Sequence, residues 1–155
     1  MQRTRIFLAA LMVGAVSVWA ATVAQGAAPT AHVARAAKVT LRHTRLGNIL
    51  ATSSGFTLYE FTHDHSSANT CVHISGCSET WPPLQTSGRP TAGPGVRASL
   101  LSTTRLPHGK TQVTYAGHPL YLYSGDSGPG ETSYVGESVF GGRWYGLNSA
   151  GGAVK

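Results

Sequence analysis

Residues 58–64 read LYEFTHD, and residues 120–126 read LYLYSGD. The similarity continues outward, because each segment follows a Thr-Arg-Leu triplet, an apolar run and a glycine-containing turn, and each precedes a tryptophan by a similar distance. The period is about 62 residues, which indicates an internal repeat that can hold several strands. We therefore predict two copies of one β unit, at about residues 44–84 and 104–147.

The pattern along the chain is typical of strands. Short runs of β-branched and aromatic residues alternate with Gly, Pro, Asn and Ser, and long helical periodicity is absent. This predicts an all-β domain over residues 39–150. Because one copy alone could not bury its apolar face, we expect two pseudo-symmetric repeats of about 60 residues, packed as one small sandwich or barrel-like domain. The expected strands are residues 47–52, 57–62, 110–115, 118–124 and 143–148.

Alternation along the two repeated segments predicts which side chains share a face. In an extended strand, every second residue points the same way. Tyr59 and Phe61 therefore share one face of the first segment, and Tyr121 and Tyr123 share one face of the second. The second segment has leucines on its other face, where the first has Glu60. We therefore expect the second segment to lie nearer the centre of the domain.

Three motifs together resemble a known family. The pattern Tyr-x-aromatic-x-x-Asp occurs at residues 59–64 and 121–126, a Cys-x5-Cys pair precedes Trp-Pro-Pro-Leu, and Phe-Gly-Gly-x-Trp follows near the C-terminus. These features resemble a bacterial family of secreted repeats and predicted lipoproteins of unknown function, which carries a Tyr-x-(Phe/Trp/Tyr)-x-x-Asp motif. The resemblance covers about residues 45–150 and implies a location outside the cytoplasm. It implies no catalytic role.

The N-terminus has the three parts of a secretory signal peptide. Two arginines precede an apolar run, and small residues follow it. We place cleavage after Gly26, which leaves 129 of the 155 residues and no expected transmembrane span. Because no cysteine lies near that point, we expect a released, secreted protein and not a lipid-anchored one. Residues 27–38 would then form a basic N-terminal arm, and residues 151–155 a C-terminal tail.

The positive charge is concentrated near the start of the mature chain. With ten basic and six acidic residues after cleavage, the mature protein carries a net charge of +4, and the residues from 46 onward are balanced. A basic segment outside the cell suits an anionic cell-wall polymer or another envelope component, although it is also typical of a solvated lead-in. The remainder has no basic stripe with interleaved aromatics, so we expect no nucleic acid partner. The candidate basic residues are Arg35, Lys38, Arg42 and Arg45.

The two cysteines and a histidine pair are the residues most suited to cross-linking or metal binding. In an exported chain, Cys71 and Cys77 are expected to form a disulfide. His63 and His65 would point the same way on a strand and could meet one metal ion. However, the second copy has Gly and Ser at the aligned positions. We therefore predict no metal and no cofactor, and keep His63 and His65 as weak candidates only.

The two repeated aspartates allow three interpretations. Asp64 and Asp126 could each cap the turn after a strand, could hold a ligand or ion, or could meet near a pseudo-two-fold axis as the acid/base pair of a hydrolase. We predict a secreted, non-catalytic binding or structural module of the cell envelope with an unknown ligand. A hydrolase using the two aspartates and a metal-binding protein are the alternatives. The candidate binding residues are Tyr59, Phe61, Asp64, Tyr121, Tyr123 and Asp126.

Overall fold

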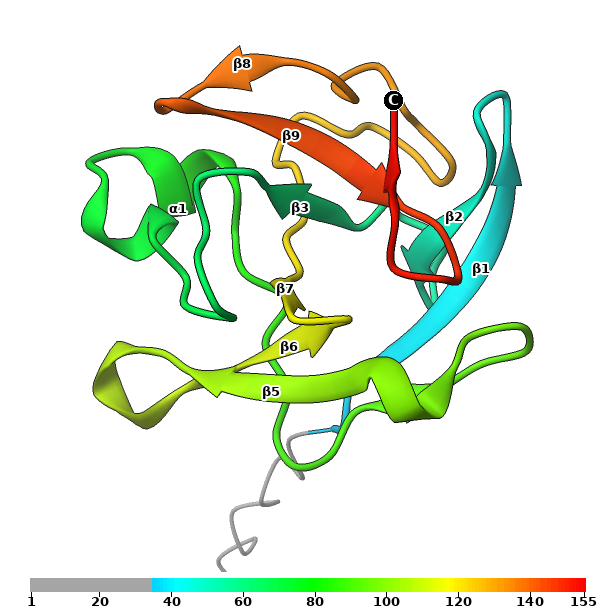
Figure 1. Cartoon of the computed structure of the whole chain (residues 1–155), viewed down its shortest axis with the longest axis horizontal. Helices are drawn as coiled ribbons and strands as arrows, with labels where there is room; N and C mark the ends of the chain where they lie inside the picture. The colour runs from blue at the N-terminus through cyan, green and yellow to red at the C-terminus, as the bar shows by residue number, and fades with distance from the viewer. Residues whose placement is uncertain (1–34) are drawn as a thin grey trace, which may run out of the picture. The chain divides into compact units, whose positions relative to one another are not determined.

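The computed structural model describes residues 35–155 (Figure 1). The predicted signal peptide and most of the predicted arm lie outside these residues. The α-helix α1 (Cys77–Thr80) is a single turn, and 3-10 turns occur at Cys71–His73, Ala98–Leu100 and Pro107–Gly109. The strands are β1 (Lys38–Thr44), β2 (Gly47–Thr52), β3 (Tyr59–Phe61), β4 (Thr91–Ala92), β5 (Leu101–Arg105), β6 (Thr111–Tyr115), β7 (His118–Pro119), β8 (Ser138–Val139), β9 (Gly142–Leu147) and β10 (Ala153–Val154).

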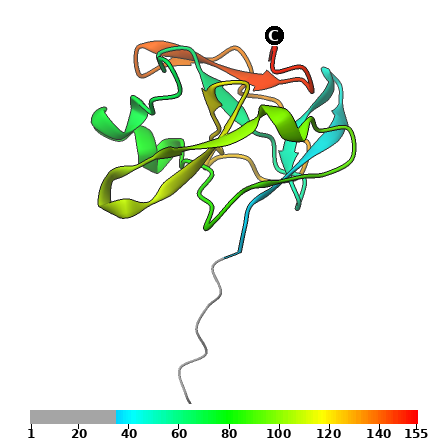
Figure 2. The ribbon, with the colours of Figure 1, turned by 60° about the horizontal axis from the view of Figure 1, so that its bottom comes forward.

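The strands form three sheets, which confirms the all-β prediction. Their strand orders are β2-β1-β4, β10-β9-β3 with β8 also on β9, and β5-β6-β7. All pairs are antiparallel except β1 with β4. The sheet of β3 and β9 lies opposite the β5–β6 hairpin, and the β1–β2 ribbon borders both (Figures 1 and 2). The sheets do not close into one barrel within residues 35–155.

The predicted hairpin of residues 47–52 with 57–62 forms only at its turn. Gly55, with a φ of +88°, donates its amide to the Thr52 carbonyl (2.9 Å), and the Leu58 amide reaches Leu50 (3.0 Å). Beyond this point β3 leaves β2 and pairs with β9. The partner of β2 is instead β1, with six residue pairs. Strand β1 was not among the predicted strands, because its basic residues suggested a solvated segment.

Two hydrophobic clusters fill the interior, and the alternation along the repeated segments distributes side chains between them. Leu58 and Leu120 belong to an aliphatic cluster, whereas Tyr59 and Tyr121 belong to an aromatic one that also holds both cysteines. The predicted faces are therefore confirmed. The expectation that the second segment lies nearer the centre is wrong, because every residue of β3 is buried. Glu60 can be buried there because its carboxylate pairs with the His118 imidazole.

The predicted disulfide is present between Cys71 and Cys77, whose Cα atoms lie 5.4 Å apart. Both cysteines are fully buried against the aromatic cluster. The bridge closes the loop that leads through α1 into Trp81. Among the described residues, no helix is long and apolar enough to cross a membrane.

Replacing both cysteines by serine should lower the free energy of unfolding by about 2 kcal/mol, because the short loop regains its freedom in the unfolded chain. Urea denaturation of the Cys71→Ser/Cys77→Ser variant would measure the loss. The wild-type protein after reduction and alkylation is the matched control and should show a similar loss. Two free thiols in the non-reduced secreted protein, detected by mass spectrometry after alkylation, would contradict this account.

Candidate functional site

The two repeated segments lie side by side in the middle of the structure. The Tyr59 amide donates to the Tyr121 carbonyl and the Tyr121 amide donates to the Tyr59 carbonyl, both at 2.9 Å. Directly opposite residues that exchange both bonds form an antiparallel pair with side chains on the same face. Both tyrosine rings are fully buried. The residues that are repeated in the sequence therefore form one continuous element of the core.

The tyrosine hydroxyls cross between the two motif copies. The Tyr121 hydroxyl donates to Oδ2 of Asp64 at 2.7 Å. The Tyr59 hydroxyl donates to the Asp126 carboxylate, at 3.3 Å from Oδ1 and 3.2 Å from Oδ2. Burial raises the pKa of both tyrosines, and the neighbouring aspartates raise it further. Each motif thus supplies a protonated donor to the carboxylate of the other, and we call these two contacts the Tyr–Asp clamp.

Asp64 is held by more than the clamp. Its Oδ1 also accepts the Thr70 amide and the Thr70 hydroxyl, each at 2.8 Å. Burial raises the pKa of this carboxyl, although the bonds from Thr70 and Tyr121 act in the opposite direction. Asp64 therefore ties together the loop that begins at the end of β3 and the ring of Tyr121. The bond differs from the local turn cap expected from the sequence, because the amide that Asp64 accepts belongs to Thr70, six residues further along the chain.

Asp126 accepts hydrogen bonds from fewer donors than Asp64 does. Among the hydrogen bonds of the described residues, its carboxylate accepts only from the Tyr59 hydroxyl. Burial raises the pKa of Asp126 to about 6, and the charge of Glu131 adds to the shift. Glu131 itself accepts from the Ser127 amide (2.9 Å) and hydroxyl (2.6 Å). Of the two clamp carboxylates, Asp126 is thus the one placed to titrate close to neutral pH.

The pKa shifts of the two aspartates have separate physical causes. The groups that shift the pKa of Asp64 are Thr70, Tyr121 and His63, together with its burial. Those that shift the pKa of Asp126 are Tyr59 and Glu131, together with its burial. Neither carboxyl perturbs the other. The sequence expectation that they could share a catalytic centre near an axis therefore finds no support in the electrostatics.

The remaining aromatic motif residues belong to a column of stacked rings. Trp81 and Trp144 stack at its centre, with ring centroids 3.9 Å apart and planes inclined by 3°. Phe61 stacks on Trp144 at 4.2 Å, and Tyr123 lies on Trp81 at 4.5 Å. Tyr134 continues the column 3.8 Å beyond Tyr123. Phe61 is thus a core residue, and Tyr123 is half-buried.

The tyrosines of the clamp meet this column edge-on. Tyr59 approaches Trp81, and Tyr121 approaches Trp144, each with ring centroids 5.1 Å apart. Such edge-to-face contacts add to the energy of burial. The two indole N–H groups are buried and have no hydrogen-bond acceptor within the described residues. The column therefore depends on stacking and burial and not on polar contacts of the tryptophans.

The histidine pair does not form a metal centre by itself. The rings of His63 and His65 lie 5.9 Å apart between centroids, and both side chains are exposed. His63 Nδ1 is 3.3 Å from the carbonyl oxygen of Gly141. Within residues 35–155, no group of three or more His, Cys, Asp or Glu side chains could hold an ion. The two imidazoles lack a third protein ligand there.

Sequence reasoning missed a buried glutamine beside the clamp that makes hydrogen bonds to two separate segments. Gln112 on β6 is fully buried, and its Oε1 accepts from Asn69 Nδ2 at 2.7 Å. Its Nε2 donates to the Leu120 carbonyl at 2.8 Å. Gln112 thereby links the loop after β3 to the second repeated segment. The one available signal was a lone amide within an otherwise apolar or β-branched strand.

The four basic residues that the sequence offered as candidates for an anionic partner do not act as one group. Arg42 lies in β1, where its guanidinium packs so close to Gly55 that a Cβ there would meet it at 2.7 Å. Arg45 Nε donates to the Thr132 hydroxyl at 3.1 Å. Arg35 and Lys38 instead line an open hollow at the start of β1. Two of the four are therefore used within the domain itself.

Comparison with known proteins gives one result that bears on this site. Residues 102–147 match a family model described as a secreted repeat of unknown function. This match agrees with the family resemblance and with a location outside the cytoplasm. The match runs from the second residue of β5 to the end of β9, and it includes Tyr121 and Trp144. No curated protein and no solved structure matches the chain.

Tyr121→Phe should lower the free energy of unfolding by about 1.5–3 kcal/mol, because it removes a hydrogen bond to a partly buried carboxylate. The ring and its contact with Trp144 are kept, so thermal or urea unfolding reports the hydroxyl alone. Tyr145→Phe is a matched control, because Tyr145 lies on β9 outside the clamp. Equal stability of Tyr121→Phe and wild type would show that the bond to Asp64 contributes nothing.

The stability of the protein should fall as pH rises from about 4 to about 6. The pKa of Asp126 is about 6 in the folded state, above its ordinary value of 3.8. The stabilising contribution of protonated Asp126 is therefore fully present below the unfolded pKa and is lost as pH rises through the folded pKa. Because the carboxyl is partly exposed to solvent, we expect the free energy of unfolding to fall by about 1 kcal/mol.

Asp126→Asn keeps an acceptor for Tyr59 but cannot ionise, so it should remove this part of the pH dependence and be at least as stable as wild type at pH 7. Urea unfolding across the pH series would measure both effects. The control is Glu79→Gln, which neutralises an exposed carboxyl of α1 and should leave the profile unchanged. A variant Asp126→Asn with the wild-type profile would refute the assignment of the titration to Asp126.

Proposed function

We propose that this protein is a non-catalytic module that works outside the cytoplasm, and that its repeated Tyr-x-aromatic-x-x-Asp motif is structural. One observation carries this proposal: each motif tyrosine is fully buried and donates its hydroxyl to the aspartate of the other motif. Residues that hold one another in this way stabilise the core and leave the surface of the domain free for binding or assembly.

The geometry of the clamp favours a structural role over catalysis. A catalytic carboxylate must reach its substrate within hydrogen-bond distance. Both oxygens of Asp64 already accept bonds from Thr70 or Tyr121. Neither aspartate lines the hollows that surround β1, β4 and β5. These observations support a structural role for both aspartates.

We infer that the domain is built from two repeats related by a pseudo-two-fold axis between Tyr59 and Tyr121. The reciprocal amide and hydroxyl bonds support this. In addition, β9, which carries Trp144, pairs with β3 of the first copy. The segment after Trp81 pairs with the second copy, because the Leu122 amide reaches Pro82 at 2.9 Å. On this proposal, the tryptophan segment of each copy completes the sheet of the other.

A hydrolase is the competing function, and one observation favours it. The pKa of Asp126 is raised to about 6, which suits a group that transfers protons near neutral pH. Against it, Asp126 has no second carboxyl that acts on its pKa apart from Glu131, whose side chain is fixed by Ser127. We therefore place the hydrolase second, and metal binding through His63 and His65 third.

Asp64→Ala separates the structural proposal from the catalytic one. A structural Asp64 predicts a loss of about 2 kcal/mol in the free energy of unfolding, because three donors lose their acceptor in a partly buried place. Tyr121→Ala should cost more, about 3–5 kcal/mol, because a buried ring is removed. Urea or thermal unfolding measures both, with Glu79→Ala as the exposed control. If Asp64→Ala unfolds at or above the wild-type temperature, the structural role is refuted, because active-site carboxylates commonly reduce stability.

A further inference from the structure

Three open hollows of the domain lie next to one another. Their volumes are about 500, 430 and 650 Å³. Gly88 and Thr111 line both the first and the second, and Arg35 lines both the second and the third. Because neighbouring hollows share lining residues, the three adjoin one another in a row that passes β5, the start of β6 and the start of β1. We call this row the basic groove.

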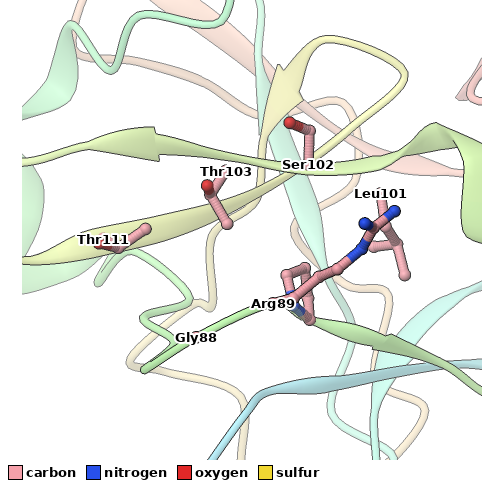
Figure 3. Close-up of a pocket in the computed structure, with 7 residues that line it drawn as sticks. Gly88, Arg89, Leu101, Ser102, Thr103 and Thr111 are labelled. Carbon is pink, nitrogen blue, oxygen red and sulfur yellow. The ribbon is translucent and has the colours of Figure 1, made fainter.

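Four cationic side chains line the basic groove, namely those of Arg35, Lys38, Arg89 and Lys110. They come from segments that are far apart in the sequence and that the fold brings together. Figure 3 shows Arg89 reaching from the segment before β4 toward Leu101 on β5. In the printed sequence, two of the four belong to the basic N-terminal segment, and the other two are isolated among neutral residues.

No carboxylate compensates these charges. The six acidic residues of the chain all lie among the described residues, and none lines the groove. The one ion pair within residues 35–155 joins His118 to Glu60. Four cations along the basic groove with no counter-charge create a positive potential that attracts an anionic partner. The remaining acidic residues are Asp64, Glu79, Asp126, Glu131 and Glu137.

The other walls of the groove indicate what kind of anion fits. Ser87, Ser102 and Thr103 contribute hydroxyls, which can donate to anionic oxygens or accept from hydroxyl groups. No aromatic side chain lines any of the three hollows, so neither nucleic acid bases nor sugar rings have a surface to stack on. Recognition would therefore rest on charges and hydrogen bonds along a flexible chain.

We propose that the basic groove binds a linear polyol phosphate chain, with successive phosphodiesters on Lys38, Arg35, Lys110 and Arg89. This inference rests on the proposed non-catalytic module and names its partner class. Arginine and lysine both bind phosphate oxygens, arginine in a two-pronged manner. A single phosphate would occupy one of the three hollows, whereas a polymer spans them all. The hydroxyls of the groove match those of the polyol.

The test measures binding of fluorescent synthetic poly(glycerol phosphate) to the mature secreted protein by anisotropy at low ionic strength. Arg89→Gln/Lys110→Gln should weaken binding at least about tenfold, because each cation near a polyanion contributes strongly to affinity. The matched control is Arg143→Gln/Lys155→Gln, which removes the same two charges from β9 and the C-terminus and should change binding less than about twofold. Thermal unfolding establishes that all variants are folded, and Lys38→Gln/Lys110→Gln is a second groove variant.

The salt dependence gives a second readout. For flexible polyphosphodiesters the affinity falls with salt by about 0.7 logarithmic units per phosphate and decade. Four engaged cations therefore predict a slope of about −3 for wild type and about −1.5 for either groove variant. No binding by wild type, or equal losses in the groove and control variants, would overturn the proposal. Equal affinity for poly-glutamate would assign the groove to acidic polypeptides and overturn it as well.

The same samples separate a failure of the groove from a failure of the proposed function. Chromatography of the probe after incubation shows whether its chain length has changed. An intact probe that dissociates from the groove variants supports both proposals. A shortened probe with unchanged discrimination between the variants would leave the groove in place and refute the non-catalytic module, and the Asp126→Asn variant would then show whether that carboxyl performs the cleavage.

Discussion

The Tyr–Asp clamp is the interaction on which the rest of this structure depends. A buried tyrosine hydroxyl needs a hydrogen-bond partner, and a partly buried carboxylate needs a donor. Tyr59 and Tyr121 satisfy both needs reciprocally with Asp126 and Asp64. The spacing of the motif follows from this arrangement. The first and third residues point into the aromatic core, and the aspartate lies beyond the strand end, where the hydroxyl of the neighbouring motif reaches it.

The two halves of the clamp are chemically unequal, and the difference comes from the loops after each segment. The loop after β3 returns Thr70 to Asp64 and carries the disulfide and α1. The loop after Tyr123 is rich in glycine, and there Ser127 turns to Glu131 and not to Asp126. Asp64 therefore accepts bonds from three donors, whereas Asp126 accepts from one hydroxyl and has a pKa of about 6. Similar motifs have thus been given different electrostatic properties by their surroundings.

The basic residues show a similar division between framework and surface. Arg42 packs against Gly55 and Gly130, and Arg45 donates a hydrogen bond to Thr132. Both side chains therefore help to hold β1 and the turn after it against the rest of the domain. Other cations stay without a carboxylate partner along the basic groove beside β5. Net charge alone cannot separate these roles, because it counts charges without regard to where the chain places them. The distribution of unpaired cations is what indicates an anionic partner.

Local pattern determined much of this protein in advance. The period-two alternation assigned Tyr59 and Phe61 to one face, and the predicted export signal together with two closely spaced cysteines predicted the disulfide. Alternation specifies only which way a side chain points, whereas the choice of neighbouring strands depends on contacts between residues far apart in the chain. For this reason the pairing of β3 with β9, the burial of Glu60 and the crossing of the clamp could not be read from the sequence. The same physical reason applies to the basic groove, since only the tertiary structure brings Arg89 and Lys110 to Arg35.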